Sequence, residues 1–97
     1  MSGASHLVSY FHGSASNADS GVIGGVGSSP RLLGVNVNKG AASAVITIYN
    51  GPSTANSIVA AIDASSKSYN DFNGARIPNG MEVVQSGGAS DFTVSYI

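Results

Sequence analysis

The stretch that decides the fold reads VITIYNGP at residues 45–52. It is rich in β-branched and aromatic residues, which favour strands because they pack well on a pleated surface. Side chains alternate across a strand, so Ile46 and Ile48 share one face. Val45 and Tyr49 lie on the other face. Apolar side chains on both faces are typical of an internal strand, or of a strand whose outer face lies in a subunit contact.

Strand patterns of the same kind flank this stretch on both sides. Upstream, Leu33, Val35 and Val37 alternate with polar residues and are expected to share one face. Downstream, residues 81–85 and 91–96 are expected to be strands, since turn residues such as Gly, Pro and Asn bound them. The sequence therefore predicts a series of short strands separated by tight turns.

Two further segments are harder to assign. Residues 57–64 fit a strand and also fit one face of a short helix, and we favour the strand because both neighbouring segments are strands. Residues 69–77 are expected to be irregular, with Tyr69, Phe72 and Ile77 as buried anchors. With these segments the chain holds about six to eight strands, a number typical of an all-β antiparallel sandwich or a jelly-roll-like fold.

The chain is long enough for a single domain, and we place its β-sandwich core at residues 31–97. The predicted core is made of apolar residues from four of the expected strands. Its members are Val35, Ile46, Ile48, Val83, Phe92 and Val94.

Residues 1–30 are expected to hold an N-terminal strand and a flexible arm. The strand is placed at residues 5–12, and the arm at residues 13–30, where Gly, Ser and Ala dominate and large side chains are sparse. Two interpretations are open. The strand either belongs to the sheet of its own domain or is a tether that adds to the sheet of a neighbouring subunit.

The composition excludes several classes of function. Charged residues make up 9% of the chain, its formal net charge is −1, and no basic run could follow a line of phosphates, so we expect no nucleic-acid partner. Cysteine is absent, which excludes thiolate metal sites and thiol catalysis. No segment resembles a signal peptide or a membrane span, so we expect the protein to be used in a cytoplasm-like compartment or inside a particle assembled there, with no membrane partner.

Residues that could carry catalysis are few and scattered. His6 and His12 lie about 20 Å apart along the expected first strand, which is too far for one metal ion. No two carboxylates are spaced to lie side by side on one strand, and no Gly-x-Ser-x-Gly motif occurs. We therefore expect a protein that is not an enzyme and that uses no metal and no cofactor.

Four motifs carry a resemblance to a known group of proteins. They are LGVNV at residues 33–37, VITIYNG at 45–51, IPNGMEV at 77–83 and FTVSY at 92–96. Together they resemble the small β-sandwich structural proteins of tailed-phage virions, especially those of marine phages. The resemblance covers residues 31–97 and implies a structural component of a virion assembled in the host cytoplasm.

Capsid decoration, or cement, proteins fit this resemblance because they are small, weakly charged and non-enzymatic. The resemblance thus implies binding to the major capsid protein or to other virion proteins, and a dimer or trimer is expected because a small cysteine-free core has little stability of its own. The alternative is a tail or head-fibre component, in which Tyr10, Tyr49 or Tyr69 could stack on a glycan or receptor. The residues expected at the assembly interface are Leu7, Val8, Tyr10, Phe11, Val45 and Tyr49.

Overall fold

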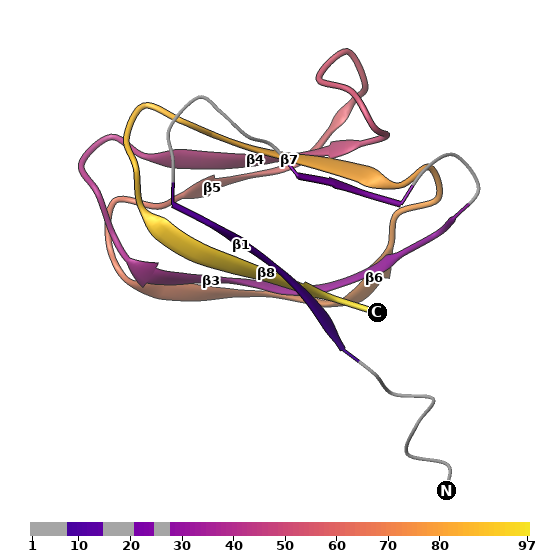
Figure 1. Cartoon of the computed structure of the whole chain (residues 1–97), viewed down its shortest axis with the longest axis horizontal. Coiled ribbons are helices and arrows are strands. Elements are labelled where there is room, and N and C mark those ends of the chain that lie inside the picture. The colour runs from indigo at the N-terminus through magenta and orange to yellow at the C-terminus, as the bar shows by residue number, and fades with distance from the viewer. Residues whose placement is uncertain (1–7, 15–20, 25–27) are drawn as a thin grey trace, which may run out of the picture.

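A computed structural model describes residues 8–14, 21–24 and 28–97, and all regular secondary structure in these ranges is β-strand. The strands lie in two antiparallel four-stranded sheets that face each other, as Figure 1 shows. The all-β sandwich predicted from the sequence is therefore confirmed. The described strands are β1 (Ser9–Gly13), β2 (Gly21–Ile23), β3 (Arg31–Lys39), β4 (Val45–Asn50), β5 (Ile58–Asp63), β6 (Ser68–Arg76), β7 (Met81–Ser86) and β8 (Asp91–Tyr96).

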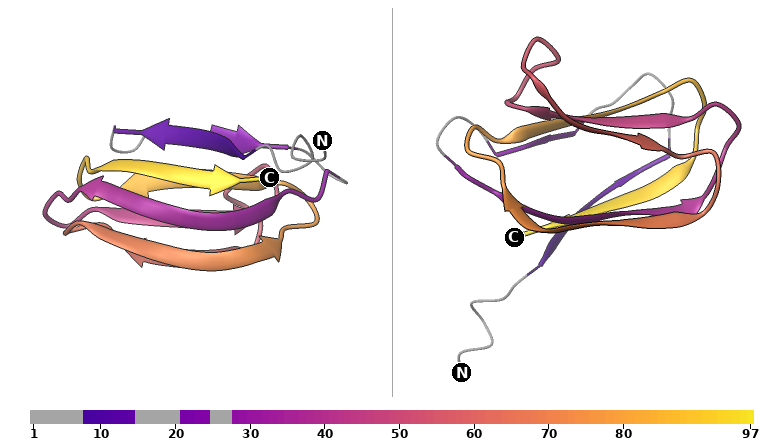
Figure 2. Two further views of the ribbon diagram at one scale, coloured as in Figure 1. Left: turned by 90° about the horizontal axis from the view of Figure 1, so that it is seen from below. Right: turned by 180° about the vertical axis from the view of Figure 1, so that it is seen from behind.

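The strand order is that of a jelly roll. Sheet A has the order β1-β8-β3-β6, and sheet B has the order β2-β7-β4-β5. The first four strands pair with the last four in reverse, as β1–β8, β2–β7, β3–β6 and β4–β5, like one long hairpin. Pairing of β3 with β8 and of β4 with β7 then rolls this hairpin into two layers, which the right-hand view of Figure 2 shows.

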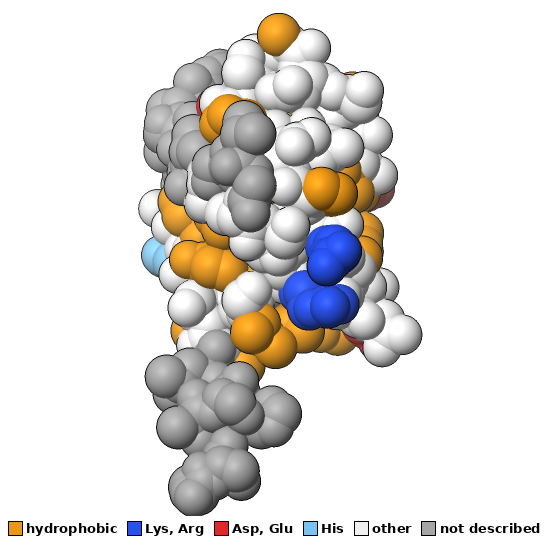
Figure 3. Space-filling view, turned by 90° about the vertical axis from the view of Figure 1, so that its right-hand side faces the viewer, with side chains coloured by type: hydrophobic (Ala, Val, Ile, Leu, Met, Phe, Trp, Pro, Cys, Tyr) orange, Lys and Arg blue, Asp and Glu red, His pale blue; other side chains and the backbone are white. Residues whose placement is uncertain are grey.

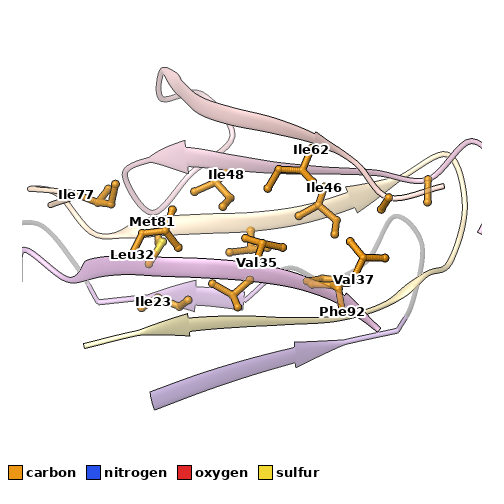
Figure 4. Close-up of a cluster of buried hydrophobic side chains, with 14 residues drawn as sticks. Ile23, Leu32, Val35, Val37, Ile46, Ile48, Ile62, Ile77, Met81 and Phe92 are labelled. Atoms are coloured by element: carbon orange, nitrogen blue, oxygen red, sulfur yellow. The ribbon is translucent and has the colours of Figure 1, made fainter. Parts of the chain in front are cut away.

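The core lies between the two sheets. Strand alternation places Ile46 and Ile48 inward from sheet B and Val35 and Val37 inward from sheet A, as Figure 4 shows. All six residues that the sequence predicted for the core are buried. The buried cluster consists of Ile23, Leu32, Val35, Val37, Ala44, Ile46, Ile48, Ile62, Ala64, Ile77, Met81, Val83, Phe92 and Val94.

Two expectations for β3 and β6 are wrong. The register of β3 shifts between Leu32 and Gly34, so Leu32 is fully buried and Leu33 only half-buried. A bulge of this kind reverses which side chains point inward on one side of it, and a pattern that simply alternates along the sequence does not predict this reversal. Residues 68–76 form an edge strand that is irregular only at Asn73 and Gly74, both of which have positive φ, and Tyr69 is exposed. Ile77 is buried as expected.

Parts of residues 1–30 belong to the two sheets. β1 pairs with β8 at the edge of sheet A, and β2 pairs with β7 at the edge of sheet B. The structure thus places residues 9–13 in the sheet of their own chain. Residues 1–7, 15–20 and 25–27, which include His6, Leu7 and much of the expected arm, lie outside the described residues.

A buried polar pair holds the connection between β7 and β8, where the chain crosses from sheet B to sheet A. The side chain of Gln85 donates from Nε2 to the Ser90 carbonyl at 3.1 Å and accepts the Ser90 backbone N–H at 2.9 Å. The Ser90 hydroxyl also contacts Gln85 Oε1. Buried polar groups are tolerated when they are hydrogen-bonded in this way, and the pair anchors the crossover inside an otherwise apolar core.

Candidate functional site

The surface available for function consists mainly of the outer faces of the two sheets, because the inner faces meet in the core. The two outer faces point away from each other on opposite sides of the molecule (Figure 1). Their chemistry differs, and the cross-strand registers show which side chains lie together on each.

The outer face of sheet B is uncharged at its centre, where a threonine lies among apolar side chains. Val84 on β7, Thr47 on β4 and Ala61 on β5 form one cross-strand row. Val45 and Tyr49 lie on either side of Thr47 along β4, and Val45 is 36% exposed. We name the surface formed by Val45, Thr47, Tyr49, Ala61 and Val84 the sheet B face.

The charged groups near the sheet B face lie at its margins. Glu82 is the cross-strand partner of Tyr49, and Asp63 is the partner of Val45. Asp63 accepts the backbone N–H of Ser65 at 2.9 Å, and hydrogen bonds from Ser65 lower the pKa of its carboxyl group. The centre of the face is thus free of formal charge among the described residues.

Strand β5 borders the sheet B face and forms the edge of sheet B. Ile58 is 60% exposed and Val59 is 38% exposed, and no proline or charged residue interrupts the strand before Asp63. Natural sheets usually protect an edge strand with a charge, a proline or a bulge, because its unpaired backbone groups can accept another strand. β5 has a register shift only near its start, opposite Tyr49, and most of its length is unprotected.

The outer face of sheet A is polar. One cross-strand row crosses all four strands, from His12 on β1 through Thr93 and Asn36 to Tyr69 on β6. Tyr10, which is 67% exposed, lies on β1 two residues from His12. The left-hand view of Figure 2 shows these four strands side by side.

Hydrogen bonds connect the polar side chains of sheet A. Asn36 donates to Asn38 Oδ1 at 3.0 Å, and Asn38 donates to Asp91 Oδ1 at 2.9 Å and to Thr93 Oγ1 at 3.1 Å. His12 Nε2 lies 3.0 Å from the same Asp91 oxygen. The hydrogen bond from Asn38, and next that from His12, hold the pKa of Asp91 below its usual range.

The six residues predicted for the assembly interface do not lie on one surface. Val45 and Tyr49 lie on the sheet B face, whereas Val8 and Tyr10 are exposed near or on β1 of sheet A. Phe11 is half-buried and packs against the core, and Leu7 lies outside the described residues. The strand favoured for residues 57–64 is confirmed as β5. The sequence reasoning did not identify Ala61, Val84 or the position of β5 at the sheet edge, because alternation does not show which strands become neighbours.

The described residues offer little for catalysis. Among the described residues, the contact between His12 Nε2 and Asp91 Oδ1 is the one that becomes an ion pair when the histidine is protonated. No three of the described His, Asp or Glu side chains cluster as metal ligands would. Arg31 and Arg76 are cross-strand partners. Figure 3, which looks onto one end of the sandwich, shows hydrophobic and uncharged side chains over most of the visible surface and basic side chains gathered in one place.

Comparison with known proteins found no related protein. The sequence matches no protein family and no curated protein, and the structure matches no solved structure. Within the described ranges, no helix has the length and apolar character needed to cross a membrane.

Proposed function

We propose that this chain is a structural protein of a tailed-phage particle, and specifically a capsid decoration protein that binds the assembled head through the sheet B face. The observation that carries the proposal is the uncharged, apolar centre of that face beside the unprotected edge of β5. Removing such a surface from water costs little, because it holds no ionised group that would lose its hydration. The cores of protein interfaces are likewise depleted in charge.

The fold and the motifs support the same proposal. Jelly rolls recur in viral capsid domains and in lectins, although a fold alone does not assign a function. The motifs at residues 33–37, 45–51, 77–83 and 92–96 resemble those of tailed-phage structural proteins. The fold and the motifs therefore favour a virion component over a free enzyme.

In this function the protein stabilises the head by mass action. A surface that spans the junction between capsid subunits exists only in the assembled shell, so binding to it shifts the equilibrium toward assembly. The β5 edge would join two copies of the chain into a dimer, since antiparallel edge pairing about a twofold axis uses the same residues on both partners.

A matched pair of lysine variants tests the proposed docking face. Ala61→Lys places a charge within the sheet B face, and Ala75→Lys makes the same change at an exposed position on β6 of sheet A. Heads stripped of the protein should rebind the wild type and Ala75→Lys, whereas Ala61→Lys should bind at least about tenfold more weakly. Equal binding of the two variants would contradict docking through sheet B.

The number of copies per particle tests the position of the protein. Quantitative mass spectrometry of purified virions should find hundreds of copies for a decoration protein. A dozen copies or fewer would instead place the chain in the tail or in a head fibre, and absence from the virion would overturn the proposal.

A further inference from the structure

We propose that the outer face of sheet A is a binding face for neutral oligosaccharides. This inference does not depend on the proposed docking through sheet B, because the two faces lie on opposite sides of the sandwich. A molecule bound to a particle through sheet B would present sheet A to the surroundings. We name the surface formed by Tyr10, His12, Asn36, Asn38, Tyr69, Asp91 and Thr93 the sheet A face.

The position of Tyr69 is the first observation. Its side chain reaches from β6 across the neighbouring strand and covers Gly34 on β3. A Cβ atom at Gly34 would lie 2.7 Å from Tyr69 Cζ and would also collide with the hydroxyl oxygen. Gly34 does not have a positive φ, so the backbone does not require glycine there. The missing side chain instead leaves room for the ring to lie over the strand.

The exposure of this ring is the second observation. Although one part of Tyr69 covers Gly34, the residue is 60% exposed. Tyr10 lies on the other edge strand of the same sheet and is 67% exposed. Three strand spacings separate the two edges, about 14 Å. Because the Tyr69 ring lies over β3, one strand inside that edge, the two rings are closer together than the edges are. Two separate aromatic rings suit an extended chain of sugars better than a single sugar.

The polar groups between the two tyrosines are the third observation. Asn36, Asn38 and Asp91 are held by the hydrogen bonds described above, so their side chains are ordered before any ligand arrives. Ordered groups lose less entropy on binding. No hydrogen bond to Asn36 Oδ1 is found among the described residues, and amide and hydroxyl groups can both donate and accept.

This combination matches the chemistry of a sugar. A pyranose ring presents apolar C–H groups on its faces, which can rest on the negative π-face of tyrosine, and hydroxyl groups at its edge, which need donors and acceptors. The charge of Asp91 is engaged by His12 and Asn38 and is also faced by Lys39, its cross-strand partner. Asp71 lies on β6 two residues from Tyr69, so the charges that border the sheet A face are of both signs. The face therefore favours a neutral ligand over a phosphorylated or acidic one.

Binding of the full chain to a printed array of neutral and acidic oligosaccharides, three to six residues long, tests the proposal. The wild type should bind a subset of the neutral probes. Tyr69→Ala and Tyr10→Ala should each weaken that binding by about tenfold or more. Tyr69→Phe, which keeps the ring, should retain most of it, and this variant also controls for loss of the cover over Gly34.

Tyr49→Ala is the matched control, because Tyr49 lies on the opposite sheet. It should leave binding to the array unchanged. The proposal is overturned if the wild type binds no neutral probe, if it binds only acidic probes in a salt-sensitive manner, or if the Tyr10 and Tyr69 variants bind as well as the wild type. None of these results bears on docking through sheet B, which the head-binding assay of Ala61→Lys tests separately.

Discussion

The ring centroids of Phe11 and Phe92 lie 6.1 Å apart, and the ring planes are inclined by 57°. The Phe92 ring also lies against Gly13, where a Cβ atom would come within 2.6 Å of ring atom Cε1. Tilted aromatic pairs at this separation are favourable beyond the area they bury. A single ring on β8 therefore holds two positions of β1, in addition to the backbone pairing of the two strands.

Replacing Phe11 with alanine should loosen β1 from the core. We expect Phe11→Ala to lower the free energy of unfolding by about 1–3 kcal/mol, less than for a fully buried phenylalanine because Phe11 is half-buried. Urea unfolding measures this. Tyr10→Ala on the same strand, whose side chain points outward, should change stability by less than about 0.5 kcal/mol. Equal costs would show that β1 is not oriented as described.

Deleting residues 2–12 asks whether β1 is needed for folding. The deletion should remove most of the β1 ladder and expose Phe92, so we expect a loss of cooperative unfolding measured by circular dichroism. A truncated chain that folds but no longer binds particles would instead show that the segment acts as a tether. One that folds and binds normally would contradict both interpretations.

Ile48 tests the register of β4. Its side chain is fully buried between the sheets, so Ile48→Ala should cost about 2–5 kcal/mol of stability. Thr47 points to the outer face of the same strand, and Thr47→Ala should cost clearly less. Thermal melts of both variants would reveal a wrong register if the order of the two effects were reversed.

Gln85 tests the polar anchor between β7 and β8. Gln85→Leu should leave the Ser90 N–H and carbonyl without these partners inside the core, at a cost of about 1–3 kcal/mol. Hydrogen exchange at the Ser90 amide should accelerate in this variant. Ser90→Ala removes only the hydroxyl contact and should cost less, so a larger loss in Ser90→Ala would contradict the assigned role of Gln85.

The pKa of Asp91 should depend mainly on Asn38. NMR titration of the wild type should find the pKa of Asp91 below the ordinary value of about 3.9. Asn38→Ala should raise it, because the largest contribution that lowers it is lost. Since the folded-state pKa is the lower one, this carboxylate contributes stability above the unfolded-state pKa, and that contribution is lost as pH falls through the folded-state pKa.

A control for this titration comes from the turn between β6 and β7. Asn79 is exposed there and makes none of the described contacts to Asp91, so Asn79→Ala should leave the pKa of Asp91 unchanged. If the pKa of Asp91 were unchanged in Asn38→Ala, the hydrogen bond from Asn38 would not be the cause of the lowered pKa.

The β5 edge should make the isolated chain self-associate. Sedimentation at micromolar concentration should find a dimer, and Val59→Lys should shift the population toward the monomer by charging the edge. Ala75→Lys on β6 should not. A wild-type chain that sediments as a single, cooperatively folding monomer would falsify this prediction.

The strands were predictable because alternation is a local property. β7 and β8 were expected within one residue of their observed bounds, and β4 forms the first six residues of the quoted stretch 45–52. Turn residues flank each of these strands, and their apolar residues recur at every second position. β6 was missed because its sequence, SYNDFNGAR, is polar and contains Asn73 and Gly74 with positive φ. An edge strand that buries little has little apolar alternation to detect.

The candidate surfaces were predictable only in part. Tyr10 and Tyr49 could be expected to be functional because both are aromatic residues in strands, but their placement on opposite sheets follows from the pairing of β1 with β8 and of β4 with β5 and β7. The sequence also contained no sign that Tyr69 covers Gly34, since the two residues lie on different strands of the β3–β6 pair.

The sequence by itself determined that this chain is an all-β sandwich with little charge and a core built from Val35, Ile46, Ile48, Val83, Phe92 and Val94. Side-chain alternation and turn residues act over a few positions, so they can be read along the chain. Only the tertiary structure decided the jelly-roll order, the bulge that turns Leu32 inward, and the separation of an apolar face from a polar one. Those features depend on pairing between strands as distant in the sequence as β1 and β8. Backbone hydrogen bonds do not distinguish one residue from another, so packing of the whole core decides which strands pair and in which register.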